Sequence, residues 1–437
     1  MDNKRLAAFE ALLKIEQDGA YSNLAVGKAI RDNRPDNEAF VRNLVYGVLQ
    51  QKILIDYRLD GLVKTGIRKV KPRARILLRM GLYQIDFMDS VPDYAAVSET
   101  VRLSRKIVPG LSGLINGVLR SYLREPIKRA FPDSDRDPAG YLSIKYSYSR
   151  ELTEKWMHRF GFQRTESLMA AGNRPPLLSI CVNTLKTSSS ELSRLLTARG
   201  YTVRLPETSD LPAAQAGSVK THALFISGSG IMNTVEFRNG LFYVQDISSM
   251  RAVAALSPGP DQQVLDVCAA PGGKSVFSSL LMENRGSIIS CDIYDHKLVL
   301  IDNTVERMGI RIIRTMKKDA SVCEEKFIES ADIVIADVPC SGLGVIRRRP
   351  EIKWKQIEAV IHELVPLQYE ILKNAAGYVR KSGKLMYSTC TISKEENEDM
   401  VKKFLLEHPE FKIVEEQQIF PDVDLSDGFY YCIMKKL

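Results

Sequence analysis

From residue 236 onward, short apolar segments rich in β-branched residues alternate with helical patterns. Five such segments read as buried strands: QQVLDV (262–267), SIISCD (287–292), RIIRT (311–315), ADIVIADV (331–338) and GKLMYST (383–389). Helical periodicity is found at 294–308, 356–379 and 395–407. Strands that alternate with helices are typical of a doubly wound, mostly parallel α/β sheet. Ligands bind such sheets at the carboxyl ends of the strands, so the loops after these segments are the predicted site.

The first of these loops is rich in glycine. The stretch LDVCAAPGGKSVF (265–277) ends like the nucleotide phosphate loop G-x-x-x-x-G-K-[ST], but Cys268 stands where that pattern begins with glycine. Glycines and small residues let backbone N–H groups approach a nucleotide of any kind. A phosphate-loop NTPase is therefore an alternative, and the missing first glycine argues against it.

Two aspartates follow the next strands. Asp292 ends the second segment, and Asp319 follows the third. An acid at the end of the second strand commonly binds the ribose hydroxyls of an adenosine ligand. The alternative for Asp292 is an exposed helix N-cap, for which aspartate is favoured. Their positions after successive strands favour an adenosine ligand.

Two cysteines follow the last two strands. Cys340 lies in DVPCSGLG (337–344) and Cys390 in YSTCTISKEENE (387–398). A thiolate beside an adenosine site is a candidate nucleophile, whereas a single cysteine is more often buried in the core. Two cysteines on neighbouring loops, with Asp337 close by, favour nucleophilic chemistry. The residues alone do not select one cysteine over the other.

The excess positive charge is confined to the N-terminal third. Residues 1–130 contain 23 Lys and Arg against 14 Asp and Glu, a net charge of +9, and the rest of the chain has a net charge of −1. Seven basic residues and no acid lie within 61–80. Helical spacing dominates residues 1–125. A basic helical domain suits nucleic acid, and the alternative for the cluster is a solvated helix end.

Between these regions the pattern changes twice. EPIKRAFPDSDRDPAG (125–140) is rich in proline and polar residues and is predicted to be a linker. Strands at 177–185 and 201–205 flank a helix at 188–200, which predicts a small α+β unit. The chain therefore divides into an all-α domain (1–130), an α+β unit (141–235) and an α/β domain (236–437).

Several classes of protein are disfavoured. No apolar run approaches the roughly 20 residues of a membrane helix, and the N-terminus lacks the features of a secretory signal. We therefore expect a cytoplasmic protein without a membrane partner. The seven cysteines form no C-x-x-C pair, and the five histidines show no ligand spacing, so we expect neither a disulfide framework nor a metal site. Nothing in the sequence demands more than a monomer.

The motifs CAAPGGK, D-x-P-C-S-G-x-G and S-T-C, in this order and with Asp292 and Asp319 between them, resemble those of the RNA 5-cytosine methyltransferases. Residues 1–130 resemble NusB, an antitermination factor that binds RNA. A NusB-like domain followed by an α+β unit and a Rossmann-like methyltransferase domain resembles the enzymes that methylate small-subunit (16S) ribosomal RNA. The resemblance covers the whole chain and implies that ribosomal RNA is the partner.

The resemblance also implies roles for individual residues. Asp292 would hold the ribose of S-adenosyl-L-methionine, Asp319 would lie by the adenine, and Asp337 would lie between cofactor and target base. Cys390 would be the nucleophile and Cys340 would help to release the product. The cofactor loop would comprise Cys268, Ala269, Ala270, Pro271, Gly272, Gly273 and Lys274, with Lys274 near the carboxylate end of the cofactor.

The sequence departs from the family pattern at two places. Cys181 stands where the family usually has arginine, and YSYSRELTEKW replaces a segment that usually contains histidine. No RNA-contact role is therefore expected at Cys181.

The implied chemistry matches the residue types. Carbon 5 of cytosine is a poor nucleophile, and addition of a thiolate at carbon 6 makes it reactive. Asp337, as a protonated or hydrogen-bonded acid near N3, would stabilise the developing negative charge. The base must be unpaired or flipped out of its helix. Two alternatives remain: a non-enzymatic RNA-binding factor, and a methyltransferase that acts on another RNA such as tRNA.

Overall fold

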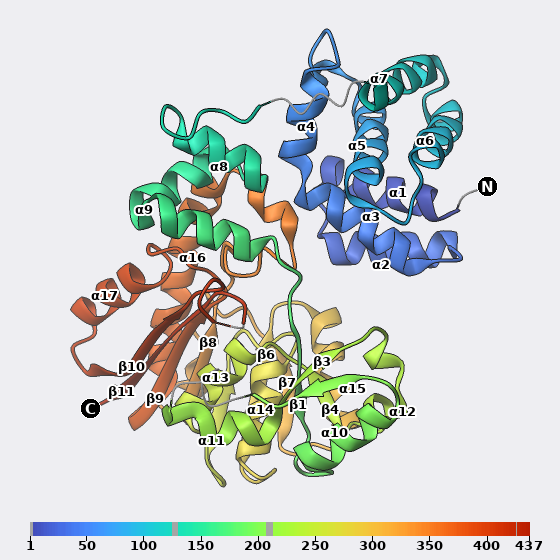
Figure 1. Cartoon of the computed structure of the whole chain (residues 1–437). Helices are drawn as coiled ribbons and strands as arrows, with labels where there is room; N and C mark the ends of the chain where they lie inside the picture. Colours follow the sequence, from blue (N-terminus) through green and yellow to red (C-terminus); the bar gives the residue numbers. More distant parts are fainter. Residues whose placement is uncertain (1–2, 125–129, 207–212, 425) are drawn as a thin grey trace. The chain divides into compact units, whose positions relative to one another are not determined.

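The computed structural model describes residues 3–124, 130–206, 213–424 and 426–437 (Figure 1). The chain forms two compact units. The first comprises Met1–Arg174 together with Ile346–Ile357, and the second comprises Pro175–Val345 together with Glu358–Leu437. Each unit has its own hydrophobic core.

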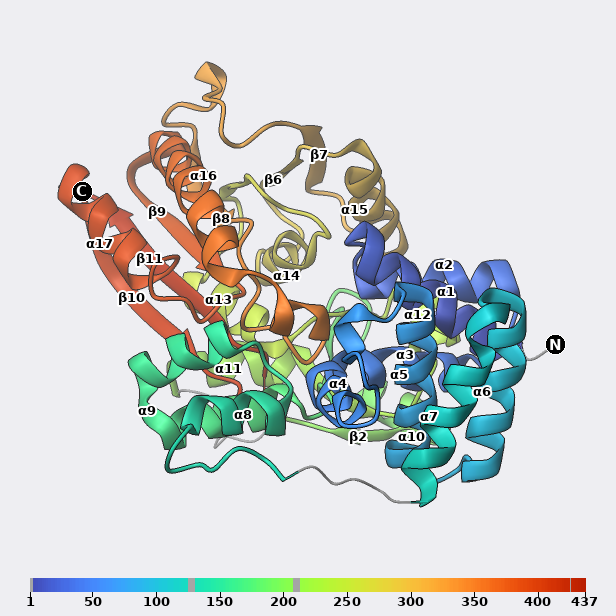
Figure 2. The same ribbon diagram turned by 90° about the horizontal axis from the view of Figure 1, so that it is seen from above.

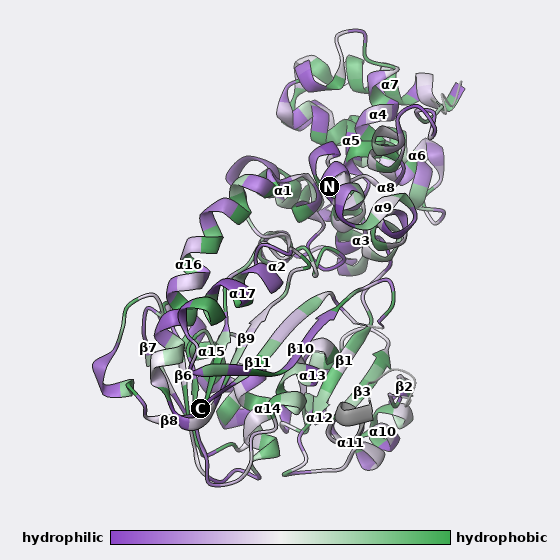
Figure 3. Ribbon diagram, turned by 90° about the vertical axis from the view of Figure 1, so that its left-hand side faces the viewer, coloured by the Kyte–Doolittle hydropathy of each residue, from purple (hydrophilic) through white to green (hydrophobic). Residues whose placement is uncertain are grey.

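The first unit is helical, as the sequence predicts. Seven of its helices enclose one core: α1 (Asn3–Asp18), α2 (Ser22–Asn33), α3 (Glu38–Gln50), α4 (Lys52–Asp60), α5 (Pro72–Phe87), α6 (Asp93–Ile107) and α7 (Ser112–Arg124). Each presents apolar residues to this core and polar residues outward, which gives the alternating colours of these helices in Figure 3. Helices α8 (Pro138–Tyr146) and α9 (Arg150–Gly172) complete the unit.

A short segment from the second half of the sequence, Ile346–Ile357, also belongs to the first unit. It contains the 3₁₀ helix η6 (Pro350–Trp354), whose Lys353 is fully buried. The Lys353 Nζ atom donates to the carbonyl oxygens of Gln50 (2.7 Å) and Tyr146 (2.8 Å) and to Asn173 Oδ1 (2.7 Å). Through these three acceptors, the buried side chain of Lys353 joins the ends of α3, α8 and α9.

The second unit begins with a small antiparallel sheet. Its strands lie in the order β2 (Thr202–Arg204), β3 (Ala223–Ser227), β1 (Leu178–Val182) and β4 (Phe242–Val244). Helices α10 (Ser189–Ala198), α11 (Ala213–His222) and α12 (Val235–Arg238) connect the strands. The predicted strand, helix and second strand of this region are thus confirmed. Cys181, which we expected to have no RNA-contact role, is buried within β1.

The large sheet contains the five predicted strands and two more. Its order is β10-β11-β9-β8-β5-β6-β7. The bounds are β5 (Gln263–Asp266), β6 (Ser287–Asp292), β7 (Ile313–Lys317), β8 (Ala331–Asp337), β9 (Val379–Thr389), β10 (Phe411–Ile419) and β11 (Phe429–Lys436). Strands β5 to β9 run parallel, which confirms the predicted sheet. Strands β10 and β11 extend it antiparallel and were not predicted.

Helices cover both faces of this sheet (Figures 1 and 2). On one face, α13 (Ile247–Leu256), α14 (Gly273–Leu281) and α15 (Asp295–Met308) pack against Ile333 and Ile335 of β8. On the other, α16 (Ile357–Tyr378) and α17 (Glu398–Glu407) pack against the alternate residues Val334 and Ala336. Burial on both faces explains why β8 has a continuous apolar sequence. Among the described residues, no helix is long and apolar enough to cross a membrane.

Candidate active site

The loops that follow the parallel strands meet at one edge of the sheet. Asp337 and Ser388 are register partners at the ends of β8 and β9. Cys268, in the loop after β5, lies close to the carboxylates of Asp266, Asp337 and Asp292, which with burial raise the pKa of its thiol well above the usual value. The structure thus brings together residues that are far apart in the sequence.

The two predicted cysteines contact each other. The Sγ atoms of Cys340 and Cys390 are 3.0 Å apart, and the Cys390 backbone N–H donates to Cys340 Sγ at 3.2 Å. Both side chains are half-buried. The Gly344 N–H donates to the Cys390 carbonyl (3.0 Å), which joins the two loops through backbone as well.

The Cys340 thiol is hard to ionise. The hydrogen bond to Cys390 raises the pKa of Cys340 well above that of an ordinary thiol, and burial and the nearby charges of Glu396 and Asp337 add to this effect.

Asp337 is held by two neighbours. Its Oδ2 atom lies 2.6 Å from Lys274 Nζ, and its Oδ1 accepts from Ser388 Oγ at 2.8 Å. The Lys274 ammonium also lies over the ring of Phe429, 5.0 Å from its centroid. We expected Lys274 near the carboxylate end of a cofactor and Asp337 as a protonated or hydrogen-bonded acid. In this structure Lys274 contacts Asp337, and Asp337 is hydrogen-bonded as expected; the place of Lys274 relative to the cofactor stays a prediction.

The glycines of the predicted cofactor loop are closely packed, and the backbone conformation of Gly272 also favours glycine. Gly272 has a φ of 102° and precedes helix α14, and a Cβ there would lie 3.2 Å from Ile301. A Cβ on Gly273 would lie 3.1 Å from Gln245 and 3.2 Å from Tyr243. At both glycines, the position that a Cβ would occupy therefore lies against other side chains of the protein. Within the same loop, Ala269 is buried, with its N–H bonded to the Cys291 carbonyl (2.7 Å).

Asp292 and Asp319 retain capacity to accept hydrogen bonds. Asp292 is buried at the end of β6, where its Oδ1 accepts from the Tyr294 N–H (3.1 Å) and its Oδ2 lies 3.5 Å from Lys297 Nζ. Asp319 is exposed after β7, and its Oδ1 accepts from the N–H and hydroxyl of Ser321. Carboxylates at successive strand ends can accept from sugar hydroxyls, so these residues fit the nucleoside that the sequence predicts. Among the described residues, no cluster of His, Cys, Asp or Glu is placed to hold a metal ion.

Asp266, directly before the glycine loop, has an unusual environment. It is fully buried and accepts from Ser275 Oγ at 2.7 Å, and Ser290 donates in turn to Ser275. Burial raises the pKa of Asp266 to about 7. Between about pH 4 and 7 the folded protein therefore keeps a proton that the unfolded chain has released, so stability falls as pH rises through this range.

Asp266→Asn should remove this pH dependence, because asparagine stays neutral. We expect the free energy of unfolding of the variant, relative to the wild type, to increase by about 2–4 kcal/mol between pH 5 and pH 8. Urea unfolding at both pH values measures the difference. A difference that does not change with pH would contradict the assignment of this proton to Asp266.

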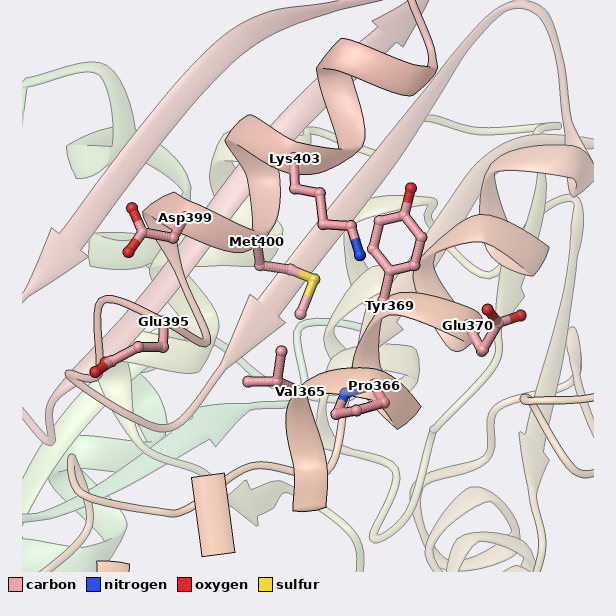
Figure 4. A pocket seen from close by; sticks show the side chains of 8 residues that line it. All are labelled: Val365, Pro366, Tyr369, Glu370, Glu395, Asp399, Met400 and Lys403. Atoms are coloured by element: carbon pink, nitrogen blue, oxygen red, sulfur yellow. The ribbon is translucent and has the colours of Figure 1, made fainter. Parts of the chain in front are cut away.

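A groove lies between α16 and α17 (Figure 4). Three carboxylates and one ammonium line it, so it does not suit a phosphate backbone. The lining residues are Val365, Pro366, Tyr369, Glu370, Glu395, Asp399, Met400 and Lys403. None of the residues predicted from the sequence is among them.

The basic cluster of the first unit is mostly exposed. Its side chains lie around the start of α5, and five are exposed: Lys64, Arg68, Lys69, Lys71 and Arg73. Arg79, which the sequence placed in this cluster, is buried and paired with Glu16 (2.5 Å) and Asp56 (2.6 Å). That part of the prediction is wrong, because α5 turns Arg79 toward the helical core. The exposed members can still reach a polyanion.

Sequence reasoning missed several polar residues that fix the site. Ser388 holds Asp337, and four others link the two cysteine loops: Ser341, Gln368, Thr391 and Glu396. Glu396 lies in the SKEENE stretch directly after the S-T-C motif. The closeness of this acid to Cys390 in the sequence was a signal that could have marked Glu396 as a candidate site residue.

Three family descriptions match successive parts of the chain. The NusB family matches residues 2–124, the "Methyltr_RsmF/B-like, ferredoxin-like domain" matches 149–213, and "16S rRNA methyltransferase RsmB/F" matches 253–435.

Curated relatives match over nearly their full length. The "Probable ribosomal RNA small subunit methyltransferase B" of Bacillus subtilis (strain 168) is 36% identical over 98% of each chain. That of Synechocystis sp. is 33% identical over 94% of this chain and 91% of the relative.

Among solved structures, PH0851 superposes with a TM-score of 0.84 at 27% identity over 100% of this chain and 99% of that chain. NSun6 from Pyrococcus horikoshii with SFG shares the fold, with a TM-score of 0.56 at 23% identity over 66% of this chain and 98% of that chain.

Proposed function

The chain belongs to the 16S rRNA methyltransferase RsmB/F family, and on that premise we propose that it methylates carbon 5 of a cytosine in 16S ribosomal RNA through a covalent bond to Cys390. It is a methyltransferase that depends on S-adenosyl-L-methionine. The observation that carries the covalent route is the contact between Cys340 and Cys390, 3.0 Å apart and next to the end of β8 that bears Asp337. A non-enzymatic RNA-binding factor would have no use for this pair.

We assign RNA binding to residues 1–130, a connecting role to residues 141–235 and methyl transfer to residues 236–437. These bounds follow function and differ from the two compact units, because residues 141–174 and 346–357 pack with the first unit. The chemistry proposed uses residues of one chain, so a monomer suffices. A ribosomal RNA substrate implies a cytoplasmic enzyme.

The cofactor would be held at the carboxyl ends of β5, β6 and β7. The loop from Cys268 to Lys274 would surround it, Asp292 would accept from its ribose hydroxyls, and Asp319 would lie on the adenine side. What supports this is the buried carboxylate of Asp292, whose Oδ2 makes a long contact of 3.5 Å with Lys297 Nζ. When bound, S-adenosyl-L-methionine supplies the electrophilic methyl group.

The cysteines divide the work on the base. The Cys390 thiolate adds to carbon 6 of the flipped cytosine, which makes carbon 5 nucleophilic. Asp337, held by Lys274 and Ser388, would lie near N3 as a protonated or hydrogen-bonded acid and stabilise the negative charge that develops on the ring. After methylation carbon 5 loses its proton to solvent and the carbon–sulfur bond breaks. Cys340, whose Sγ lies 3.0 Å from that of Cys390, would donate a proton to the departing Cys390 sulfur and so assist release.

Bisulfite sequencing of 16S rRNA tests this function. RNA is compared from cells that contain the wild-type gene, no gene, or the gene with Cys390→Ala. We expect at least one cytosine that resists conversion only with the wild-type gene. If the same cytosines resist conversion in all three strains, the proposed substrate is wrong. A tRNA substrate is distinguished by sequencing the tRNA of the same strains.

The exposed basic cluster should supply salt-sensitive affinity for RNA. In Arg68→Gln/Lys69→Gln we expect weaker binding and a log–log salt dependence that is shallower by about 1–2 units, because each phosphate contact contributes a little less than one unit. Filter binding from 50 to 300 mM salt measures both. The matched control, Lys28→Gln/Arg105→Gln, removes two exposed charges elsewhere in the same unit. Equal losses in both variants would show that net charge, and not this cluster, determines binding.

A further inference from the structure

Glu396 is a fully buried carboxylate in the loop after β9. Its Oε1 atom accepts from the Ser341 N–H (2.8 Å) and from Gln368 Nε2 (2.9 Å), and its Oε2 accepts from Ser341 Oγ (2.5 Å). Burying a charge is costly unless donors replace its water. Here three donors do so, and such charge-assisted bonds are short and strong.

Two of the three donors belong to Ser341, next to Cys340, and the third is Gln368 of α16. Ser341 directly follows Cys340, and Gln368 of α16 also donates to the carbonyl of Pro339, directly before Cys340 (2.9 Å). Thr391 directly follows Cys390, and its Oγ1 lies 2.8 Å from Ser341 Oγ. The Cys340 turn is therefore fixed on both sides by groups bonded to Glu396, and one more hydrogen bond reaches the Cys390 loop.

The position of Glu396 is itself fixed by the same loop. The Tyr387 hydroxyl donates to the Glu396 carbonyl (2.7 Å). The neighbouring Asn397 accepts from Thr389 Oγ1 (2.6 Å) and donates to the Thr391 carbonyl (3.1 Å). The carboxylate is thus anchored to the S-T-C segment from both sides of Cys390.

We propose that Glu396 is the positioning residue of the cysteine pair, and that its carboxylate holds the Cys340 turn against the Cys390 loop so that the two sulfurs stay in contact. Glu396 bonds to neither cysteine side chain and acts through Ser341, Gln368 and Thr391. The geometric part of this inference stands alone. Its consequence for catalysis rests on the proposed function.

The geometric part is tested by the rate at which the two thiols pair. Full-length protein is treated with diamide, whose N=N bond takes up the two thiol hydrogens as the S–S bond forms. Non-reducing peptide mapping then follows the Cys340–Cys390 disulfide. We expect rapid pairing in the wild type and pairing slower by about tenfold or more in Glu396→Ala, because thiols that are no longer held in place react as distant groups do.

Two further variants keep the test decisive. Glu396→Gln preserves the side-chain volume but replaces one acceptor by an NH₂ group facing Ser341. We expect disulfide formation in this variant to be slower by about threefold. If Glu396→Ala does not fold, Glu396→Gln provides the test. Asp332→Asn is the matched control, because Asp332 is a buried carboxylate at the opposite end of β8, bonded to the Gln263 N–H (2.8 Å) and to Arg380. Pairing in Asp332→Asn should equal that of the wild type. Pairing as fast in the folded Glu396 variants as in the wild type would overturn the proposal.

The catalytic part has a separate readout. With 16S rRNA as substrate, Glu396→Gln should lower kcat with little change in KM and accumulate a covalent protein–RNA adduct, as a displaced Cys340 would cause. If the Cys340–Cys390 disulfide forms more slowly in the Glu396 variants but neither variant accumulates an RNA adduct, the proposed function fails while the positioning role stands. If pairing is unchanged, the positioning role fails whatever the RNA experiments give.

Discussion

Cys390→Ala is expected to abolish methyl transfer to 16S rRNA while binding of S-adenosyl-L-methionine stays within about twofold of the wild type. Without the sulfur, carbon 6 has no nucleophile and carbon 5 remains unreactive, so the rate should fall by at least about 10,000-fold, as for other enzymes that lose a nucleophile. Transfer of a labelled methyl group measures the rate, and calorimetric titration measures cofactor affinity.

The matched control for this variant is Cys323→Ala. Cys323 is an exposed thiol after β7 and has no role in the mechanism proposed. Its replacement should leave activity unchanged. Full activity in Cys390→Ala would remove Cys390 from the mechanism, and equal losses in both variants would indicate a general sensitivity to loss of thiols.

Cys340→Ala is expected to leave the first half of the reaction intact and to block the second. The thiolate of Cys390 can still add to the base, but no proton donor remains 3.0 Å from its sulfur when it departs. We expect turnover to fall by about 100-fold or more, the usual contribution of a positioned acid, and a covalent adduct with RNA to accumulate. A denaturing gel detects the adduct as a band of reduced mobility.

The double variant Cys340→Ala/Cys390→Ala is the control for this experiment. It should give no shifted band, because the adduct requires the Cys390 sulfur. A band in the double variant would show that another residue reacts with RNA. Absence of the band in Cys340→Ala alone would contradict the role of Cys340 in release.

Much of the fold could be predicted because the strands of a two-sided sheet have distinctive sequences. Segments such as 331–338 are apolar on both faces, and the helices between them have regular periodicity. Strands β10 and β11 were missed for the opposite reason. The edge strand β10, FKIVEEQQI, is largely polar and half-exposed, and β11 lacks a following helix that would mark it as part of the alternating pattern.

The sequence predicted which residues lie at the strand ends, but it did not predict which of their side chains contact one another. The strand ends indicated Asp292, Asp337, Cys340 and Cys390, because parallel strands bring such residues to one edge. Sequence spacing does not reveal which side chains meet across loops. The pairing of Lys274 with Asp337 and the bonds from Glu396 to the Cys340 turn depend on side-chain contacts between separate elements. The same limit caused the error at Arg79, whose partners lie on α1 and α4.

The identity of the nucleophile is tested most directly by trapping it. RNA that contains 5-fluorocytidine retains fluorine at carbon 5, so the adduct cannot eliminate the enzyme. Wild-type protein is incubated with fluorinated 16S rRNA and S-adenosyl-L-methionine, digested, and analysed by peptide mass spectrometry. We predict a modified cytosine attached to Cys390 and none attached to Cys340. Attachment at Cys340, or a protein that forms no adduct with this RNA, would contradict the mechanism proposed.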